Sequence, residues 1–455
     1  MRIAYYSPLP PMRSGIADYS AELLPHLAAH CEVELVVDEG FRPDAEAAGR
    51  FPVHGHRALP ALLATGGFDA VLYQLGNNRD YHAAIYRALL AHPGVVVLHE
   101  FVLHHLVRDL TLHASDAEAY VAEMRYAYGK TGEAMARRSV ATGVPLDPWS
   151  YPLFERVVDA SRGLIVHNRF TRDRVLAGRP LARNAVVPHH LSLGALPETS
   201  PERARAALGL APGAFVVATF GFLTAAKRPG VLLRAFARLR REVPEARLLI
   251  AGEVSPHFDF DRVFTPELRE GVAVTGRLGL DRFLLHMQAC DVAVALRHPT
   301  AGETSGTVVR LLGLGKPLMA SDAGAFAEIP DGCCAKVGLD DGEEELLLAY
   351  LRRLAADEPL RRQLGENARR HAAACHSMAG SARGYAEFLR ATVESGARPF
   401  RAVPPLAPYP EEDLLSDLVR EVAADLADLG VEEADDGLLR EAAAAMVELD
   451  LDRPR

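Results

Sequence analysis

Short apolar segments alternate with longer amphipathic segments along this chain, and they do so in two separate series. The apolar segments of the first series lie at residues 1–6, 33–37, 70–74, 95–99, 164–167 and 185–187. Those of the second series lie at residues 216–220, 246–251, 272–275, 292–295 and 318–320. Strands that alternate with helices form parallel sheets covered by helices on both faces. The pattern therefore predicts an α/β protein with two doubly wound, Rossmann-like sheet domains.

The length of the chain and its turn-rich segments set the expected domain boundaries. With 455 residues the chain exceeds one ordinary hydrophobic core. Turn formers at residues 188–201 indicate a linker, so we expect an N-terminal domain at 1–190 and a second domain at 195–396 that ends in a crossover helix. Residues 117–142 are expected to form a long helix between the fourth and fifth strands.

A C-terminal appendix is expected after a run of prolines that begins at residue 399. Apolar residues recur at helical spacing over 411–455. We therefore predict a small acidic helical appendix that packs on the body of the protein or on a second subunit, which makes a homo-oligomer possible.

Charge and cysteine content exclude several classes of protein. The net charge is −10, and residues 397–455 hold six arginines and fifteen acidic residues, so the rest of the chain is close to neutral. Such a body is not expected to bind nucleic acid. The five cysteines have no metal-type spacing, which argues against a disulfide framework or a zinc site.

The hydropathy of the chain bears on its location. No stretch approaches the roughly 20 apolar residues of a transmembrane helix, and the sequence begins directly with a predicted strand. We expect a cytoplasmic protein without a transmembrane segment.

The run at residues 297–330 carries the strongest functional pattern. A carboxylate leads into small hydroxyl residues and a glycine, and an apolar helical stretch at 308–314 follows. The residues before this stretch are Glu303, Thr304, Ser305, Gly306 and Thr307. The first backbone N–H groups of a helix lack intrahelical partners and lie at the positive end of its dipole, so they suit a diphosphate.

This run resembles the donor-site signature of the family 4 retaining glycosyltransferases. The resemblance rests on Pro299, Gly302, Glu303, Ser305, Gly306, Gly315, Pro317, Ser321, Asp322, Gly324 and Glu328. It implies the GT-B fold, in which two Rossmann-like domains face a cleft. It also implies that Glu303 binds the donor sugar and that the backbone of residues 304–307 holds the diphosphate.

One departure from the family pattern concerns the ribose of the donor. The family usually carries a second glutamate on the following helix, where it holds the nucleotide ribose. That place falls on Arg310 when the run is aligned from Gly315, and on Leu311 when it is aligned from Glu303. Ribose binding is therefore not carried over, and Arg310 is kept as a donor-binding candidate.

Two candidates lie in the first domain. Gly15 follows the first strand in a loop that lacks the G-x-G-x-x-G pattern, which disfavours a nicotinamide or flavin cofactor. By resemblance, Gly15 approaches the donor diphosphate or the acceptor. His99 ends the fourth strand and is expected to hydrogen-bond a sugar or acceptor hydroxyl. The alternatives are a structural turn for Gly15 and a core histidine for His99.

Three further candidates lie in the second domain. Lys227 and Arg228 follow its first strand, where two cations would stabilise the charge that develops on a departing diphosphate. Lys227 matches the family's lysine, whereas the usual arginine is Phe222 here, and Arg228 is a possible substitute. Arg277 lies in a loop that resembles the one that receives the nucleotide base. A solvated Lys-Arg pair and a surface arginine are the alternatives.

Together with the resemblance, the sequence thus predicts a retaining, hexosyltransferase-like glycosyltransferase that acts without a metal ion or other cofactor. Its predicted catalytic residues are Glu303, Lys227 and His99. Its partners would be a nucleotide-diphosphate sugar and an acceptor hydroxyl of a sugar, a lipid-linked glycan or a small molecule, in bacterial glycan or glycoconjugate synthesis. A GT-B nucleotide-sugar epimerase or hydrolase and a non-catalytic sugar-nucleotide-binding protein are the alternatives. The donor base, the sugar and the acceptor are left open.

Overall fold

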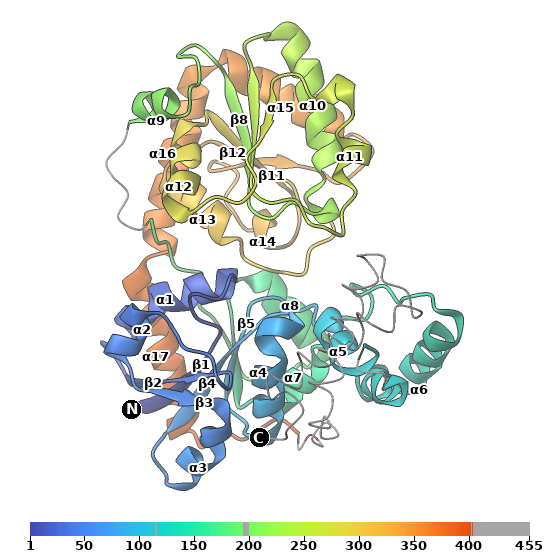
Figure 1. The fold of residues 1–455 in the computed structure, drawn as a ribbon, viewed down its shortest axis with the longest axis vertical. Coiled ribbons are helices and arrows are strands. Elements are labelled where there is room, and N and C mark those ends of the chain that lie inside the picture. Colours follow the sequence, from blue (N-terminus) through green and yellow to red (C-terminus); the bar gives the residue numbers. More distant parts are fainter. Residues whose placement is uncertain (114–115, 194–199, 402, 404–455) are drawn as a thin grey trace, which may run out of the picture.

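The protein consists of two α/β domains, one above the other along the long axis of the molecule (Figure 1). This computed structural model describes residues 1–113, 116–193, 200–401 and 403. The appendix expected at 411–455 lies outside the described residues, and so do residues 194–199 of the expected linker.

The first domain is built on a parallel sheet. Within the described residues it has seven strands in the order β3-β2-β1-β4-β5-β6-β7. They are β1 (Arg2–Tyr6), β2 (Glu32–Val37), β3 (Val53–Gly55), β4 (Ala70–Leu75), β5 (Val95–Leu98), β6 (Gly163–Val166) and β7 (Asn184–Val186). The sequence missed β3, because its three half-buried residues are too few to show an apolar run.

The second domain repeats the parallel arrangement. Its described residues form six strands in the order β10-β9-β8-β11-β12-β13. They are β8 (Val216–Phe220), β9 (Arg247–Ala251), β10 (Val272–Val274), β11 (Val292–Ala295), β12 (Leu318–Ser321) and β13 (Ala335–Val337). Strand β13 was also missed, and it is again only three residues long.

Helices cover both faces of the first sheet (Figure 1). They are α1 (Gly15–Leu27), α2 (Ala45–Arg50), α3 (Leu59–Ala64), α4 (Arg79–Ala91), α5 (His104–Thr111), α6 (Ala117–Thr142), α7 (Glu155–Ala160) and α8 (Arg169–Gly178), with a 3-10 turn η1 (His56–Ala58). Helix α6 has the expected bounds and is kinked at Gly129, where φ is 65° and ψ is −150°. Glycine adopts this positive φ without the steric cost that a side chain would add.

The helices of the second domain include the one that opens the predicted phosphate site, α13. They are α9 (Pro201–Ala207), α10 (Pro229–Glu242), α11 (Phe260–Val263), α12 (Leu280–Ala289), α13 (Gly306–Gly313), α14 (Gly324–Ala327), α15 (Glu343–Ala356) and α16 (Glu358–Cys375), with 3-10 turns η2 (Ala225–Lys227) and η3 (Pro266–Leu268).

The last described helix, α17 (Met378–Glu394), returns to the first domain (Figure 1). It packs against α1, and its buried Tyr385 and Leu389 share one hydrophobic cluster with Ile3 and Tyr5 of β1. The hydroxyl groups of Tyr385 and Tyr19 lie 2.7 Å apart. The described chain therefore crosses twice between the domains, and α17 completes the core of the first.

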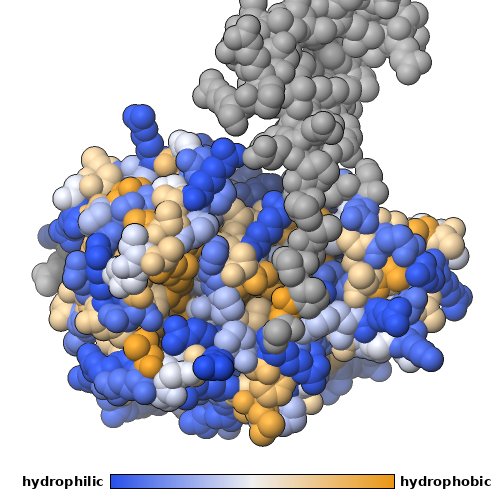
Figure 2. Space-filling model, turned by 90° about the horizontal axis from the view of Figure 1, so that it is seen from below, coloured by the Kyte–Doolittle hydropathy of each residue, from blue (hydrophilic) through white to orange (hydrophobic). Residues whose placement is uncertain are grey.

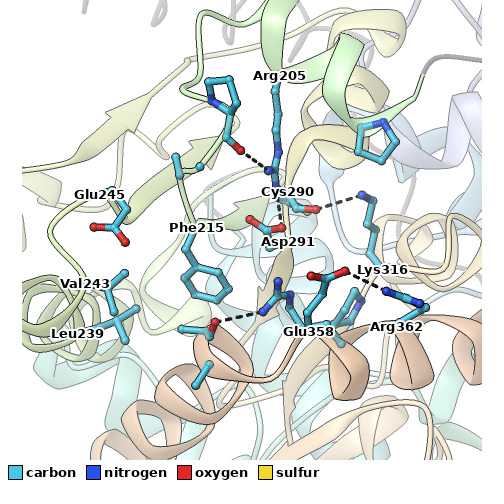
Figure 3. Close-up of a pocket in the computed structure, with 18 of the residues that line it drawn as sticks. Arg205, Phe215, Leu239, Val243, Glu245, Cys290, Asp291, Lys316, Glu358 and Arg362 are labelled. Carbon is cyan, nitrogen blue, oxygen red and sulfur yellow. Dashed lines mark hydrogen bonds and ion pairs between the residues drawn. The ribbon is translucent and has the colours of Figure 1, made fainter.

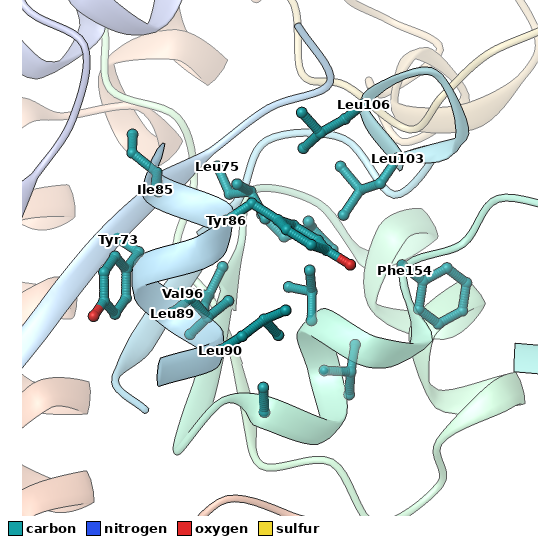
Figure 4. Close-up of a cluster of buried hydrophobic side chains, with 14 of the residues drawn as sticks. Tyr73, Leu75, Ile85, Tyr86, Leu89, Leu90, Val96, Leu103, Leu106 and Phe154 are labelled. Atoms are coloured by element: carbon teal, nitrogen blue, oxygen red, sulfur yellow. The ribbon is translucent and has the colours of Figure 1, made fainter. Parts of the chain in front are cut away.

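The opposite face of the first sheet is closed by α4. Figure 4 shows Tyr86, Leu89 and Leu90 of this helix packed over Val96 of β5, with Phe154 beyond them. Burying each of these large apolar side chains contributes about 1.5–3 kcal/mol. Seen from below, the part of the first domain that is not drawn in grey has interspersed hydrophilic and hydrophobic residues (Figure 2). Among the described helices, none combines the length and the apolar character that crossing a membrane requires.

Candidate active site

The loop between β11 and α13 brings the predicted donor residues together at the carboxyl edge of the second sheet, which is where ligands bind in open α/β sheets. Ser305 is the N-cap of α13, and its hydroxyl accepts a hydrogen bond of 3.3 Å from the backbone N–H of Val308. Gly302 has a φ of 81°, and a Cβ atom there would lie 2.5 Å from the hydroxyl of Thr171. Only glycine therefore fits between this loop and the first domain.

The carboxylate of Glu303 is held at the start of this helix by three groups. It forms an ion pair with Arg297, and its Oε2 accepts hydrogen bonds from the backbone N–H of Ala301 at 3.0 Å and the hydroxyl of Thr300 at 3.3 Å. Its side chain is still 32% exposed. Glu303 is thus an oriented carboxylate that a ligand can reach.

Lys227 lies beside the same helix terminus. Its ammonium group donates a hydrogen bond of 2.6 Å to the carbonyl of Phe220, at the end of β8. It lines a cavity of about 20 Å³ together with Arg297, Ser305 and Thr307. Burial, followed by the positive charge of Arg297, lowers the pKa of Lys227 to about 7. An anion that enters this place would favour the protonated amine.

Arg228 differs from the expectation that it joins Lys227. It adopts a left-handed conformation, with φ 51° and ψ 47°, and its guanidinium pairs with the buried Glu343 at the start of α15. Its charge is engaged there, since removing it would leave Glu343 buried without a counter-ion. The second cation beside Lys227 is Arg297. The sequence interpretation missed it, because its place six residues before Glu303 was the only sign of a role in the site.

The two domains meet at the donor loop. The side-chain amide of Asn168 donates hydrogen bonds to the carbonyl of Gly302 at 2.7 Å and to the hydroxyl of Thr304 at 2.9 Å. The backbone N–H of Phe101 donates to the carbonyl of Ala301 at 2.9 Å. Glu328 of the signature accepts from the backbone N–H of Phe170, at 2.7 Å, in the first turn of α8. These bonds hold the first domain against the loop that carries Glu303.

His99 belongs to a cluster of four histidines around Tyr19. Its Nε2 lies 2.7 Å from Oε1 of Gln74, and its ring centroid is 5.0 Å from that of Tyr19. The other members are His167, His189 and His190. Burial, together with the charge that His167 would carry, holds the pKa of His99 well below its ordinary value of 6.5. His99 is therefore a neutral imidazole, as a hydrogen-bonding role requires.

The histidine cluster reaches the start of helix α13 through His189. Its Nε2 would lie 3.2 Å from a Cβ atom on Gly306, the first residue of α13. No sequence pattern indicated this cluster, because its histidines come from separate segments that only the fold brings together.

Gly15 and Arg277 both line a second cavity of about 300 Å³. It is lined by the loop from Pro10 to Gly15, by Asp18 of α1, and by Arg277 of the second domain. Arg310, in contrast, is only 15% exposed and pairs with Glu22 of α1. The site therefore continues from the start of α13 towards the loop expected to receive a base.

Glu100 is a further carboxyl group that the sequence interpretation missed, although it directly follows His99. It accepts a hydrogen bond of 3.0 Å from the backbone N–H of Asn77. Burial, followed by the negative charge of Glu303, raises the pKa of Glu100 to about 8. The cleft thus holds two carboxyl groups in different environments: the buried Glu100, whose raised pKa favours the neutral acid, on the first domain, and Glu303, paired with Arg297, on the second.

A larger cavity of about 820 Å³ lies at the amino ends of the second sheet, away from these residues (Figure 3). Several of its charged groups already have partners: Arg205 pairs with Asp291, Arg362 pairs with Glu358, and Lys316 donates to backbone carbonyls. We therefore place the active site at the carboxyl edge. The described residues contain no group of three or more side chains arranged to hold a metal ion.

Residues 200–371 match the family model described as glycosyl transferases group 1. Curated proteins similar to this chain include the D-inositol 3-phosphate glycosyltransferase of Corynebacterium kroppenstedtii, which is 28% identical over 278 residues, or 57% of this chain and 60% of that protein. The same enzyme of Segniliparus rotundus is 30% identical over 48% of this chain and 49% of its own length. The chain thus spans between half and three fifths of these relatives.

Solved structures similar to this chain share the fold of most of its length. The sucrose-phosphate synthase of Thermosynechococcus elongatus has a TM-score of 0.63 at 16% identity, over 87% of this chain and 100% of that one. HepE of Anabaena, solved with UDP-glucose, has a TM-score of 0.60 at 16% identity, over 86% of this chain and 100% of that one. For the described residues, the GT-B fold expected from the sequence is confirmed.

Proposed function

We propose that this protein transfers a sugar from a nucleotide-diphosphate donor to an acceptor hydroxyl, with retention at the anomeric carbon. The observation that carries the proposal is the convergence of Lys227, Arg297 and the first turn of α13 beside Glu303. Two cations and a helix N-terminus form an anion site, and a carboxylate next to it suits the sugar attached to that anion. The names of the relatives support the reaction class, and the UDP-glucose complex of HepE supports the donor class.

In the proposed reaction, the bond between the anomeric carbon and the donor phosphate oxygen breaks, and its electron pair stays on the phosphate. Lys227 and the backbone N–H groups of residues 304–307 stabilise the charge that develops there. The acceptor oxygen forms the new bond on the same face of the sugar, and its proton passes to the leaving phosphate. Glu303 binds sugar hydroxyls and stabilises the positive charge at the anomeric carbon, while the neutral His99 binds a sugar or acceptor hydroxyl.

This proposal needs no divalent metal ion, because the cations and the helix terminus replace it. Activity is therefore expected to survive excess EDTA. We propose a role in bacterial glycan or glycoconjugate synthesis inside the cytoplasm. The reaction class named for its bacterial relatives supports this proposal.

The test begins with UDP-, GDP-, ADP- and CDP-sugars in a thermal-shift screen, followed by NMR of the products with the donor that binds. We expect a glycoside with the anomeric configuration of the donor. Glu303→Gln should reduce turnover by roughly 10²-fold or more, with the dissociation constant of the nucleotide diphosphate changed only a few-fold. Glu242→Gln, which removes a carboxylate from the surface pair with Arg352, is the matched control.

Three results would contradict the proposal. Free sugar alone would indicate a hydrolase, an altered sugar-nucleotide would indicate an epimerase, and binding of the donor without turnover would indicate a non-catalytic protein. Activity that EDTA abolishes and Mg²⁺ restores would contradict the metal-independent mechanism.

A further inference from the structure

Arg310 of α13 connects the two domains. Its Nη2 lies 2.6 Å from Oε1 of Glu22 on α1, and its Nε donates a hydrogen bond of 3.0 Å to the carbonyl of Ser192. The side chains of Arg310 and Glu22 are only 15% and 17% exposed. Both ions are thus largely withdrawn from water, and each requires the other.

The second carboxylate oxygen of Glu22 is also held. Its Oε2 lies 3.1 Å from Nε2 of His190, whose side chain is fully buried. Burial opposes ionisation of Glu22, but the hydrogen bond to His190 and the charge of Arg310 outweigh it, so the pKa of Glu22 is lowered. Glu22 is therefore an ionised carboxylate in a fixed orientation. Nδ1 of His190 is buried without a hydrogen-bond partner, so this corner of the cleft is not fully satisfied by the protein itself.

The pair lies between the two parts of the site. On one side, Nη1 of Arg310 would be 3.3 Å from a Cβ atom on Gly306, where the phosphate-binding helix begins. On the other side, Asp18 precedes Glu22 by one turn of α1 and lines the cavity of about 300 Å³ with Arg277. The charges of Glu22, Arg310 and Arg277 all act on Asp18. Glu22 and Arg310 thus lie between Gly306, at the start of α13, and Asp18, in the wall of this cavity.

The chemistry of the position of Glu22 suits a ribose. An ionised carboxylate accepts hydrogen bonds from sugar hydroxyls, and a single acidic side chain binds the ribose 2′-hydroxyl in other nucleotide-binding α/β folds. Helix α13 has the sequence Gly-Thr-Val-Val-Arg-Leu-Leu-Gly and offers no carboxylate of its own. We propose that Glu22 of the first domain binds the ribose hydroxyls of the donor nucleotide, with Arg310 as the residue that positions it.

This inference rests on the proposed function and adds a specific consequence to it. The nucleotide would be recognised by both domains, since Glu22 lies on α1 and the diphosphate site lies on α13. Binding of the nucleotide would therefore stabilise the contact between the domains as well as occupy the site on the second domain.

The experiment is a calorimetric titration of the full-length protein with UDP and 2′-deoxy-UDP, or with the corresponding pair for whichever nucleotide the thermal-shift screen selects. We expect the wild type to prefer the ribonucleotide by about tenfold (about 1.4 kcal/mol). Glu22→Gln should reduce this preference to about twofold or less, because the neutral amide replaces a carboxylate acceptor, while binding of the 2′-deoxynucleotide changes little. Glu242→Gln should keep the full preference.

An unchanged ribose preference in folded Glu22→Gln would overturn the proposal and leave the Glu22–Arg310 pair as a domain contact only. If Glu22→Gln does not fold, Glu22→Asp keeps the charge but withdraws the carboxylate by one methylene, and it should also lower the preference. An undiminished preference in that variant would equally overturn the proposal. If the wild type binds none of the four nucleotide diphosphates, the proposed function itself fails, which is a different result.

Discussion

At the scale of single residues, the charge state of Lys227 is the most informative property of the site. Its ammonium group is buried beside Arg297, and its pKa of about 7 is far below the ordinary 10.5. Near neutral pH it is therefore close to half protonated, and a bound diphosphate would draw a proton to it. Lys316 is a useful comparison, because it is also a buried lysine bonded to carbonyl oxygens but lies at the opposite edge of the sheet.

We predict that binding of UDP, or of the nucleotide selected by the screen, takes up a proton above pH 7 and weakens as the pH rises. Lys227→Met should lower the affinity roughly 10- to 100-fold at pH 7, the effect of a lost charge-assisted hydrogen bond. It should also remove most of the pH dependence. Calorimetry in buffers of different ionisation enthalpy measures the proton uptake directly. Equal proton uptake in Lys227→Met and the wild type would assign the proton to another group, and Lys316→Met is the control.

The residues that local order alone could indicate are those in one continuous segment, whereas Lys227 and His99 were indicated by their place after a strand and by the family resemblance. Glu303 and residues 304–307 precede a helix in the sequence, and their local order is enough to predict a phosphate site. The contacts of Glu22 with Arg310, and of Glu328 of the signature with the first turn of α8, exist only through pairing across the domains. No spacing within either segment reports such a contact.

At the scale of elements, the strands and helices with long apolar patterns were predictable. Strands β8 and β11 and helix α6 have the expected bounds, because fully apolar runs or long helical periods mark them. The three-residue strands β3 and β13 were missed, since pairing with a neighbouring strand defines them rather than their own composition. The N-cap hydrogen bonds of the helices are likewise made within a few residues of the chain. One N-cap, Asn168 of α8, has a second role.

Asn168 caps α8 and also joins the domains. Its Oδ1 accepts a hydrogen bond of 2.7 Å from the backbone N–H of Thr171, while its amide nitrogen donates to Gly302 and Thr304. Asn168→Asp keeps the capping oxygen and removes only the donor. We predict a loss of about 1–3 kcal/mol in the free energy of unfolding, because the buried carbonyl of Gly302 meets a carboxylate. Helix content, measured by circular dichroism, should not change.

The control for this variant is Asn78→Asp. Asn78 caps α4 through a hydrogen bond of 2.8 Å from the backbone N–H of Asp80, and it is exposed. Chemical unfolding should therefore show little change for Asn78→Asp. Similar losses in both variants would mean that the cap, and not the domain contact, accounts for the effect.

At the scale of the whole molecule, the pH dependence of stability depends on buried neutral histidines. His167 lies in the cluster around Tyr19, and its pKa is lowered to about 4 by burial. Burial also lowers the pKa of His82, on α4, to about 4. In the unfolded chain both titrate near 6.5, so between pH 6.5 and 4 the unfolded state binds more protons than the folded state.

We therefore predict that the protein loses stability as the pH falls from about 6.5 to 4, by about 3 kcal/mol for each of these two histidines. Urea unfolding at intervals of pH measures this loss. Above pH 6.5 the two histidines contribute no pH dependence, since they are neutral in both states. A free energy of unfolding that stays constant down to pH 4 would show that the histidines are already protonated in the folded protein or that they are not buried.

The return of α17 to the first domain sets an order of events during synthesis on the ribosome. Tyr385 and Leu389 are the last-made parts of a cluster whose first-made part is Ile3. Because these side chains emerge only after the entire second domain, the nascent first domain has no complete core while the second domain is already free to fold. The first domain, which is synthesised first, must therefore complete its folding last. A chain stalled before residue 378 would expose the apolar surface of β1 and α1 to chaperones.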